Sequence, residues 1–309
     1  MIKNTSGKFP DYIPLYYRVF CKIRKVKRQA YVRLNEYYAR RSGPIDIMPD
    51  GIGTFVLSSA SSKINPGHAV NKSGMWIEED LSSPEIRKVA DDIEAVKDIL
   101  RSNKLRYTSA AGTFIERMYT LHSERNKLWE NAWAVYHSKV KAGHRVLDIG
   151  GASTAFIFYL ASLGCSVKVV DNDWSCCGII YNTNYVAQKM GWDIEVFDRN
   201  IAKPIPFSDG SFDRIFSICT IEHLSSSIRR GMMREAGRVL KPGGIAGITI
   251  DYDLGRKMLI SDKGLRFGYR QKLFEEIISP SGLSLYGNDE FIDMNPEENF
   301  LGVIFLKKD

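Results

Sequence analysis

The stretch VLDIGGASTAF, from Val146 to Phe156, decides the fold of this chain. Its first residues form a short apolar run typical of a buried strand, and the small residues that follow allow a tight turn. In open α/β sheets, ligands bind at the carboxyl ends of strands, where small residues let the backbone come close. The stretch therefore predicts a strand, a ligand-binding turn and the start of a helix, in that order.

Strand and helix patterns alternate from this stretch to the end of the chain. Short β-branched runs alternate with helical patterns, which is typical of a parallel sheet with helices on both faces. The expected strands are Arg145–Ile149, Ser166–Val170, Asp193–Phe197, Asp213–Ile218, Ile245–Ile250, and a closing pair, Leu283–Tyr286 with Leu301–Leu306. A helix is expected over Tyr269–Ile278. We predict a Rossmann-like, doubly wound α/β domain over residues 141–309, with a mostly parallel seven-stranded sheet whose last strand is antiparallel.

Two acidic residues indicate the kind of ligand. Asp171 ends the second expected strand, 21 positions after Gly150, where a carboxylate can accept both hydroxyls of a ribose. A nicotinamide cofactor would share this acid, but its turn has the pattern GxGxxG, because a pyrophosphate sits on the helix N-terminus. Here that pattern is broken, and a carboxylate at Asp148 would repel a pyrophosphate and suit an ammonium group. These residues favour a nucleoside that carries the ammonium end of a methionine.

From about Lys141 to Asp309 the sequence resembles the class I S-adenosylmethionine-dependent methyltransferases. Four landmarks in order carry the resemblance: VLDIGG (Val146–Gly151), VVDND (Val169–Asp173), VFDRNI (Val196–Ile201) and PFSDGSFDRIFSICTIEHL (Pro206–Leu224), followed by EAGRVLKPGGIAGITI (Glu235–Ile250). The turn RVLKPGG ends a helix and reverses the chain into a strand. A lone glycine-rich turn occurs in many folds, whereas this order and spacing are specific.

The resemblance implies S-adenosylmethionine as cofactor, with Asp171 on the ribose, Asp198 on the adenine amino group and a main-chain amide from Arg199. The expected cofactor residues are Asp148, Gly150, Gly151, Ser153, Asp171, Asn172, Asp198, Arg199 and Cys219. Within the fourth landmark, Asp209 and Asp213 have a purely structural alternative, as a turn residue and a strand start.

The first landmark departs from the family in one respect. Ala152 and Thr154 stand where the family usually has further glycines. Ala152 is small enough for the backbone to come close. We expect the hydroxyl of Ser153 or of Thr154 to donate a hydrogen bond to the cofactor carboxylate, so that the site is a variant and not a lost one.

Methyl transfer from a sulfonium needs an acceptor in line behind the methyl group, so positioning and exclusion of water are the main tasks. A base is required only for a hydroxyl acceptor. His223, just past the fourth expected strand, is the expected general base, because imidazole titrates near neutral pH. The alternative is a histidine that caps the next helix or packs under the lid. Candidates for binding the acceptor are Glu222, Tyr252 and Asp253, and no metal is expected.

Missing motifs narrow the acceptor. No Asn/Asp-Pro-Pro-Tyr motif follows the fourth strand, where Ser217–Thr220 stands, and the Pro-Cys nucleophile of cytosine-5 enzymes is missing. We expect O-methylation of a small molecule, a sugar or glycan, or a lipid-linked precursor. Two further hypotheses stay open. One is an RNA-associated methyltransferase or RNA-binding protein. The other is a non-catalytic cofactor-binding scaffold, and the presence of Asp148, Asp171 and Asp198 argues against it.

The net charge of +7 is concentrated at one end of the chain. Residues 1–41 carry eleven basic and two acidic side chains, or +9, which leaves −2 for the remainder. Apolar residues recur there at helical spacing, at Leu15, Val19, Ile23, Val26, Ala30, Leu34 and Tyr37. We therefore expect a basic amphipathic helical arm. Three interpretations stay open: the apolar stripe packs on the body of the protein, it docks on a membrane surface, or the arm binds a nucleic acid or another polyanion.

Between the arm and the catalytic domain, residues 42–83 are expected to form a loop or linker, because they are rich in Gly, Pro and Ser. Residues 84–140 are expected to form a helical cap or lid, in which Trp129, Trp133, Tyr136 and His137 act as core or docking residues. The sequence shows no membrane-spanning run or signal peptide, and its five cysteines include no CxxC pair. We expect a cytoplasmic protein with peripheral contact to the inner membrane surface through the arm as one option.

Overall fold

The computed structural model describes residues 13–19, 54–56, 74–75, 78–108, 121–173, 178–251, 274–286, 290–292 and 301–309. Tyr252 and Asp253 lie outside the described residues. So do most of the predicted arm and the first half of the helix expected over Tyr269–Ile278.

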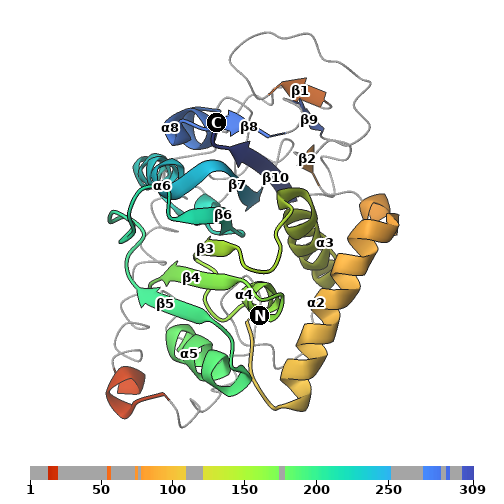
Figure 1. Ribbon diagram of the computed structural model, residues 1–309, viewed down its shortest axis with the longest axis vertical. Coiled ribbons are helices and arrows are strands. Elements are labelled where there is room, and N and C mark those ends of the chain that lie inside the picture. The colour runs from red at the N-terminus through yellow and green to blue at the C-terminus, as the bar shows by residue number, and fades with distance from the viewer. Residues whose placement is uncertain are drawn as a thin grey trace, which may run out of the picture.

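A parallel sheet forms the centre of the molecule (Figure 1). Its strands are β3 (Arg145–Ile149), β4 (Ser166–Asp171), β5 (Ile194–Asp198), β6 (Phe212–Ser217) and β7 (Leu240–Asp251). They lie in the order β7-β6-β3-β4-β5, and β10 (Leu301–Lys307) runs antiparallel beside β7. A short strand, β8 (Ser284–Leu285), pairs with the far edge of β10. This confirms the predicted seven-stranded sheet with an antiparallel last strand.

The sheet continues past β10 in three short strands that the sequence did not reveal. They are β1 (Thr54–Val56), β2 (Gly74–Met75) and β9 (Glu290–Ile292), in the order β1-β9-β2-β10. A 3-10 helix, η1 (Glu78–Ser82), follows β2. The expected loop over residues 42–83 is therefore wrong at β1, β2 and η1. Strands of two or three residues are too short for a periodic pattern, and distant partners supply their hydrogen bonds.

Helices cover both faces of the sheet and create two apolar cores. They are α2 (Pro84–Ser102), α3 (Leu121–Ser138), α4 (Ala155–Ser162), α5 (Ile179–Met190), α6 (Ser226–Val239), and, after β7, η3 (Phe274–Ile278) and α8 (Ser279–Ser281). Because side chains alternate along a strand, Val146 joins the core under α2 to α5, whereas Leu147 and Ile149 join the core under α6. Among the described helices, none has the length and apolarity to cross a bilayer.

The predicted helix after Ser83 is confirmed as α2, with Pro84 in its first turn and Ile86, Ile93 and Leu100 on its buried face. It packs against α3 and α4. On α3, Trp129 is buried and stacks on Trp133, and His137 lies against Phe305 of β10. These aromatic side chains are core and docking residues, as expected, whereas Tyr136 is exposed.

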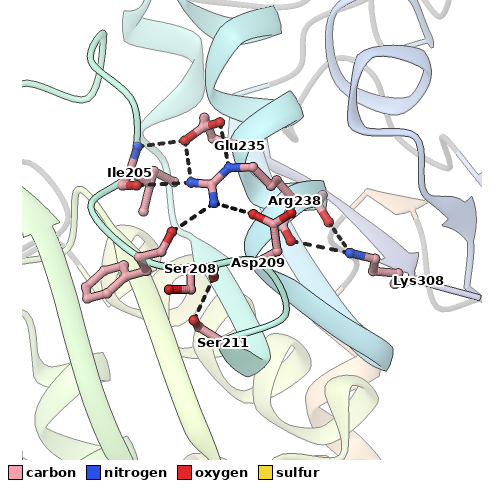
Figure 2. A network of polar contacts seen from close by, with 9 residues as sticks. Ile205, Ser208, Asp209, Ser211, Glu235, Arg238 and Lys308 are labelled. Atoms are coloured by element: carbon pink, nitrogen blue, oxygen red, sulfur yellow. Dashed lines mark hydrogen bonds and ion pairs between the residues drawn. The ribbon is translucent and has the colours of Figure 1, made fainter.

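Arg238, near the end of α6, fastens the loop that leads into β6 (Figure 2). Its guanidinium donates to the carbonyl oxygens of Ile205 and Phe207 at 3.0 and 2.8 Å, and it pairs with Glu235 and Asp209 at 2.8 and 2.7 Å. Asp209 therefore has the structural role that was its alternative interpretation. Arg238 thus holds the loop that precedes β6 against α6.

Candidate cofactor site

The turn between β3 and α4 has a backbone that suits small residues. Gly150 has a φ of +92° and Ser153 a φ of +69°, both in the left-handed region. The Gly150 N–H donates to the Val170 carbonyl at 2.9 Å. A Cβ on Gly150 would lie 2.4 Å from the Cγ2 atom of Thr220. The turn is therefore pressed between the ends of β4 and β6.

Asp148 is a fully buried carboxylate beneath this turn. Neither of its oxygens has a hydrogen-bond partner in the described part of the chain. A Cβ on Gly151 would lie 2.2 Å from Oδ1, so glycine is required directly over the carboxylate. Burial raises the pKa of Asp148 from 3.8 to about 8, and the nearby Gly151 N–H lowers it only in part without reaching hydrogen-bond geometry. A cationic group placed beside Asp148 would stabilise its ionised form.

Asp171 ends β4 beside the same turn. Its carboxylate accepts the Ala152 N–H at 3.1 Å and the Asn172 N–H at 2.7 Å. Burial raises the pKa of Asp171 to about 6, although these backbone donors lower it in part. In the β4–β5 ladder Asp171 lies directly opposite Asp198, which is exposed. The two acids expected at the ribose and the adenine therefore stand together at one edge of the sheet.

Of the two hydroxyls expected at the cofactor carboxylate, Thr154 is wrong, whereas Ser153 stays a prediction. The Thr154 hydroxyl caps α4, because it accepts the Ile157 N–H at 3.5 Å and donates to the Gly151 carbonyl at 2.8 Å. The Ser153 hydroxyl is fully buried and receives a hydrogen bond from the Asn182 amide at 2.5 Å. The Thr154 proton is therefore used within the turn, whereas the hydrogen bond from Asn182 uses only the acceptor capacity of the Ser153 hydroxyl.

The expected role of the Arg199 main chain is also wrong. Its N–H donates to the Asp171 carbonyl at 2.7 Å, and a backbone amide has one proton. That amide therefore fixes the end of β4 against the end of β5 and is not available to an adenine ring.

A polar network that the sequence analysis missed surrounds Cys219. Cys219 has a φ of +45°, and its N–H donates to the Thr249 hydroxyl at 2.8 Å. Glu130 of α3 is fully buried and accepts from that hydroxyl and, at 3.0 Å, from the Cys219 thiol. Lys127 donates to Glu130 at 2.8 Å and to the Cys219 sulfur at 2.7 Å. The network connects α3 to the carboxyl end of β6.

Electrostatics hold this network together. Burial acts to lower the pKa of Lys127, but the neighbouring Glu130 carboxylate and the hydrogen-bonded Cys219 sulfur outweigh it and raise that pKa above the ordinary lysine value. One signal would have found Glu130: it precedes Trp133 by three residues and His137 by seven, so a carboxylate shares the apolar face of α3.

Past β6 the chain forms a 3-10 turn, η2 (Ile221–His223). Glu222 is fully buried there, whereas His223 is exposed. The N-cap of α6 is Ser225, so the alternative in which His223 caps that helix is wrong. The base role of His223 and the acceptor role of Glu222 stay predictions, as do the cofactor roles of the residues around the turn.

The fold and site together define a class of protein. The sheet is Rossmann-like, and its first turn is built around two acids without a dinucleotide pattern, as in class I methyltransferase domains. Residues 146–244 match the family model described as a methyltransferase domain. The chain therefore contains a domain of this family.

Sequence relatives agree with that assignment. The chain is 34% identical over 112 residues to methyltransferase GfsG of Streptomyces halstedii, covering 36% of this chain and 38% of that protein. It is 31% identical over 128 residues to sterol 24-C-methyltransferase erg6 of Schizosaccharomyces pombe, covering 39% and 32%. Demethylmenaquinone methyltransferase of Tropheryma whipplei is 32% identical over 105 residues, covering 34% and 41%. The matches thus span about a third to two fifths of the length of these relatives.

Among solved structures, the [4+2]-cyclase SpnF is similar with a TM-score of 0.48 and 14% identity, over 59% of this chain and 82% of that one. At this low sequence identity, the similarity concerns the fold alone.

Proposed function

We propose that this protein is an S-adenosylmethionine-dependent methyltransferase that methylates a hydroxyl of a small molecule, a sugar or glycan, or a lipid-linked precursor. The observation that carries the proposal is Asp148, a fully buried carboxylate without a hydrogen-bond partner among the described residues, beside a turn that admits only glycine over it. Burial without partners disfavours the ionised form of Asp148, as its raised pKa shows, and a cationic ligand group would stabilise that form.

The residues at the edge of the sheet fit the parts of the cofactor. Asp148 would face the ammonium group of the methionine end, and Asp171, with lone pairs left after its two backbone donors, would accept the ribose hydroxyls. Asp198, exposed beside Asp171, would accept the adenine amino group. When bound, S-adenosylmethionine supplies an electrophilic methyl group.

The acceptor side lies at the end of β6, because Thr220 touches the cofactor turn at Gly150 and η2 follows directly. His223 would take the proton of an acceptor hydroxyl, and its exposure leaves it accessible to solvent for release of that proton. The name of one relative specifies carbon 24 of a sterol as the methylated position, and the name of another specifies demethylmenaquinone. These names support a small-molecule acceptor, whereas the carbon in the first name does not support a hydroxyl, which is proposed from the position of His223.

Tracing a labelled methyl group tests the proposal. The purified full chain is incubated with a cell extract and S-adenosylmethionine that carries a deuterated methyl group, and small molecules, lipids, glycans and RNA are separated and analysed by mass spectrometry. Label in a hydroxyl-derived ether of a small molecule, glycan or lipid supports the proposal. Label confined to RNA would contradict the acceptor class, and no label in any fraction would favour a non-catalytic scaffold.

The role of His223 has its own test. Removal of a general base lowers turnover by about 10²- to 10⁴-fold. We expect His223→Ala to lose turnover on that scale at neutral pH, with S-adenosylhomocysteine affinity kept. Near wild-type turnover in this variant would remove the general-base role and leave the methyltransferase assignment intact.

A further inference from the structure

Residues 13–19 dock beside the candidate cofactor site, where a single helical turn at residues 15–19 lies against α5 (Figure 1). The Tyr17 hydroxyl donates to the buried carboxylate of Asp173, which also accepts the Gly178 N–H at 2.8 Å. The Tyr17 ring meets the Tyr181 ring edge-on at 4.7 Å. The side chain of Ile13 fills the space in front of Gly178, where a Cβ would lie 2.2 Å from it. This segment is therefore anchored two residues past Asp171.

The anchoring determines which side chains face outward. Residues two positions from Tyr17 point about 200° around a helix, to its opposite side. Leu15 and Val19, which begin the predicted apolar stripe, are accordingly 74% and 51% exposed, and Tyr16 is 69% exposed. The interpretation in which the stripe packs on the body is thus wrong for these residues. The body binds the Tyr17 face of the helix instead, because Asp173 offers a buried acceptor there.

The exposed face is more apolar than cationic. Arg18, the basic residue of this turn, is partly buried, and its Nε donates to the Ile13 carbonyl at 2.6 Å. A nucleic-acid surface would present arginine and lysine to phosphates, with rings for stacking. Here the aliphatic side chains of Leu15 and Val19 point outward, and the ring of Tyr16 is exposed although its hydroxyl lies 2.8 Å from the Tyr181 hydroxyl of α5. All three belong to a strongly basic stretch. Residues 1–41 carry a net charge of +9.

We propose that Leu15, Tyr16 and Val19 form a membrane-contact face that inserts among the headgroups of an anionic lipid surface, to which the positive charge of residues 1–41 attracts the protein. Aliphatic and aromatic side chains on one side of a basic helical segment are the features that bind helices to such surfaces. Through Tyr17 and Asp173, this face is fixed to the edge of the sheet that carries the candidate cofactor site. The proposal does not depend on methyl transfer.

Co-sedimentation with vesicles tests this surface on the full chain. The vesicles contain either phosphatidylcholine alone or phosphatidylcholine mixed with phosphatidylglycerol. We expect binding to the anionic vesicles, weakening as salt is added. The double variant Leu15→Ser with Val19→Ser should bind roughly tenfold more weakly. Ile99→Ser is the matched control, because Ile99 is a 45% exposed aliphatic residue on α2, and it should bind as the wild type does.

Several outcomes would overturn the proposal. They are no binding to anionic vesicles, equal binding by the double variant and the wild type, and an equal loss in the Ile99→Ser variant. Binding to RNA in a gel shift without binding to vesicles would assign the basic stretch to a nucleic acid. Circular dichroism of each variant verifies that the fold is kept, and both altered positions are exposed, so the variants are expected to fold.

Discussion

Replacing Asp148 by Asn should make the free energy of unfolding less sensitive to rising pH. In the native state burial raises the pKa of Asp148 from 3.8 to about 8. A carboxyl whose pKa is higher in the folded state than in the unfolded state binds more protons when folded. Its contribution to stability is therefore fully present below pH 3.8 and is lost as the pH rises toward 8. Asn is neutral and isosteric, so the variant lacks this loss.

The size of the effect follows from proton linkage. Between the two pKa values, the free energy of unfolding of the wild type should fall by about 1.4 kcal/mol per pH unit because of this one group. The difference between Asp148→Asn and the wild type should therefore grow by roughly 4 kcal/mol from pH 5 to pH 8 and then level off. The buried amide of Asn adds a fixed offset of about 1–3 kcal/mol against the variant, which does not change with pH.

Urea unfolding of both proteins, followed by circular dichroism at pH 5, 6, 7 and 8, measures this difference. Asp91→Asn, at a carboxylate on the exposed face of α2, is the control and should leave the pH dependence of the wild type unchanged. A constant difference between Asp148→Asn and the wild type across this range would refute the reasoning, because Asp148 would then ionise in the native state much as it does in the unfolded chain.

The same carboxyl should make cofactor binding depend on pH. If an ammonium group compensates Asp148, only the ionised form binds it well, so the affinity for S-adenosylhomocysteine should rise about tenfold per pH unit below pH 8. Asp148→Asn should bind weakly and without this rise. Equal pH profiles for the two proteins would remove Asp148 from the cofactor site.

Three further substitutions test the packing around the site. Gly150→Ala should destabilise the protein by about 1 kcal/mol more than Gly143→Ala, because both glycines have positive φ but only Gly150 has a side chain within 4 Å; equal losses in urea unfolding would contradict the close contact. Arg238→Ala should cost about 1–3 kcal/mol, because the Phe207 carbonyl loses its Arg238 donor and the Ile205 carbonyl keeps only the Phe207 N–H, whereas Asp209→Ala, at a 79% exposed side chain, should cost under about 1 kcal/mol; the reverse order in thermal melts would refute the role of Arg238 in holding this loop. Glu130→Gln should lower stability by roughly 1–3 kcal/mol and weaken S-adenosylhomocysteine binding through Cys219; unchanged calorimetry would leave Glu130 a purely structural residue.

The sequence predicted the central sheet well because its strands are long enough to carry a pattern. Each expected strand from Arg145 to Ile250 is present within a few residues, and the antiparallel ending is confirmed. The strands β1, β2 and β9 could not be predicted, because two or three residues carry no period and their pairing partners are distant in the chain. The outward position of Leu15 was also hidden, because helical periodicity cannot reveal that Asp173, 156 residues after Tyr17, selects another face.

For the site, the acids were predictable and their surroundings were not. Asp148 and Asp171 lie at the carboxyl ends of β3 and β4, and parallel strands bring these ends to one edge. Hydrogen bonds within the turn are a different matter, because Thr154 and Arg199 each have several feasible partners in a sequence. The structure commits the Thr154 hydroxyl to a helix cap and the Arg199 amide to Asp171. Glu130 was not predicted as part of the site, because the tryptophans of α3 indicate packing alone.

Calorimetric titration of the full chain with S-adenosylhomocysteine tests the central claim most directly. We expect binding by the wild type and by Asp98→Ala, an exposed acid on α2, and a loss of about 100-fold or more for Asp171→Ala, which removes the acceptor of the ribose hydroxyls. No binding by the wild type, or the same affinity in Asp171→Ala, would contradict the cofactor site on which the whole account rests.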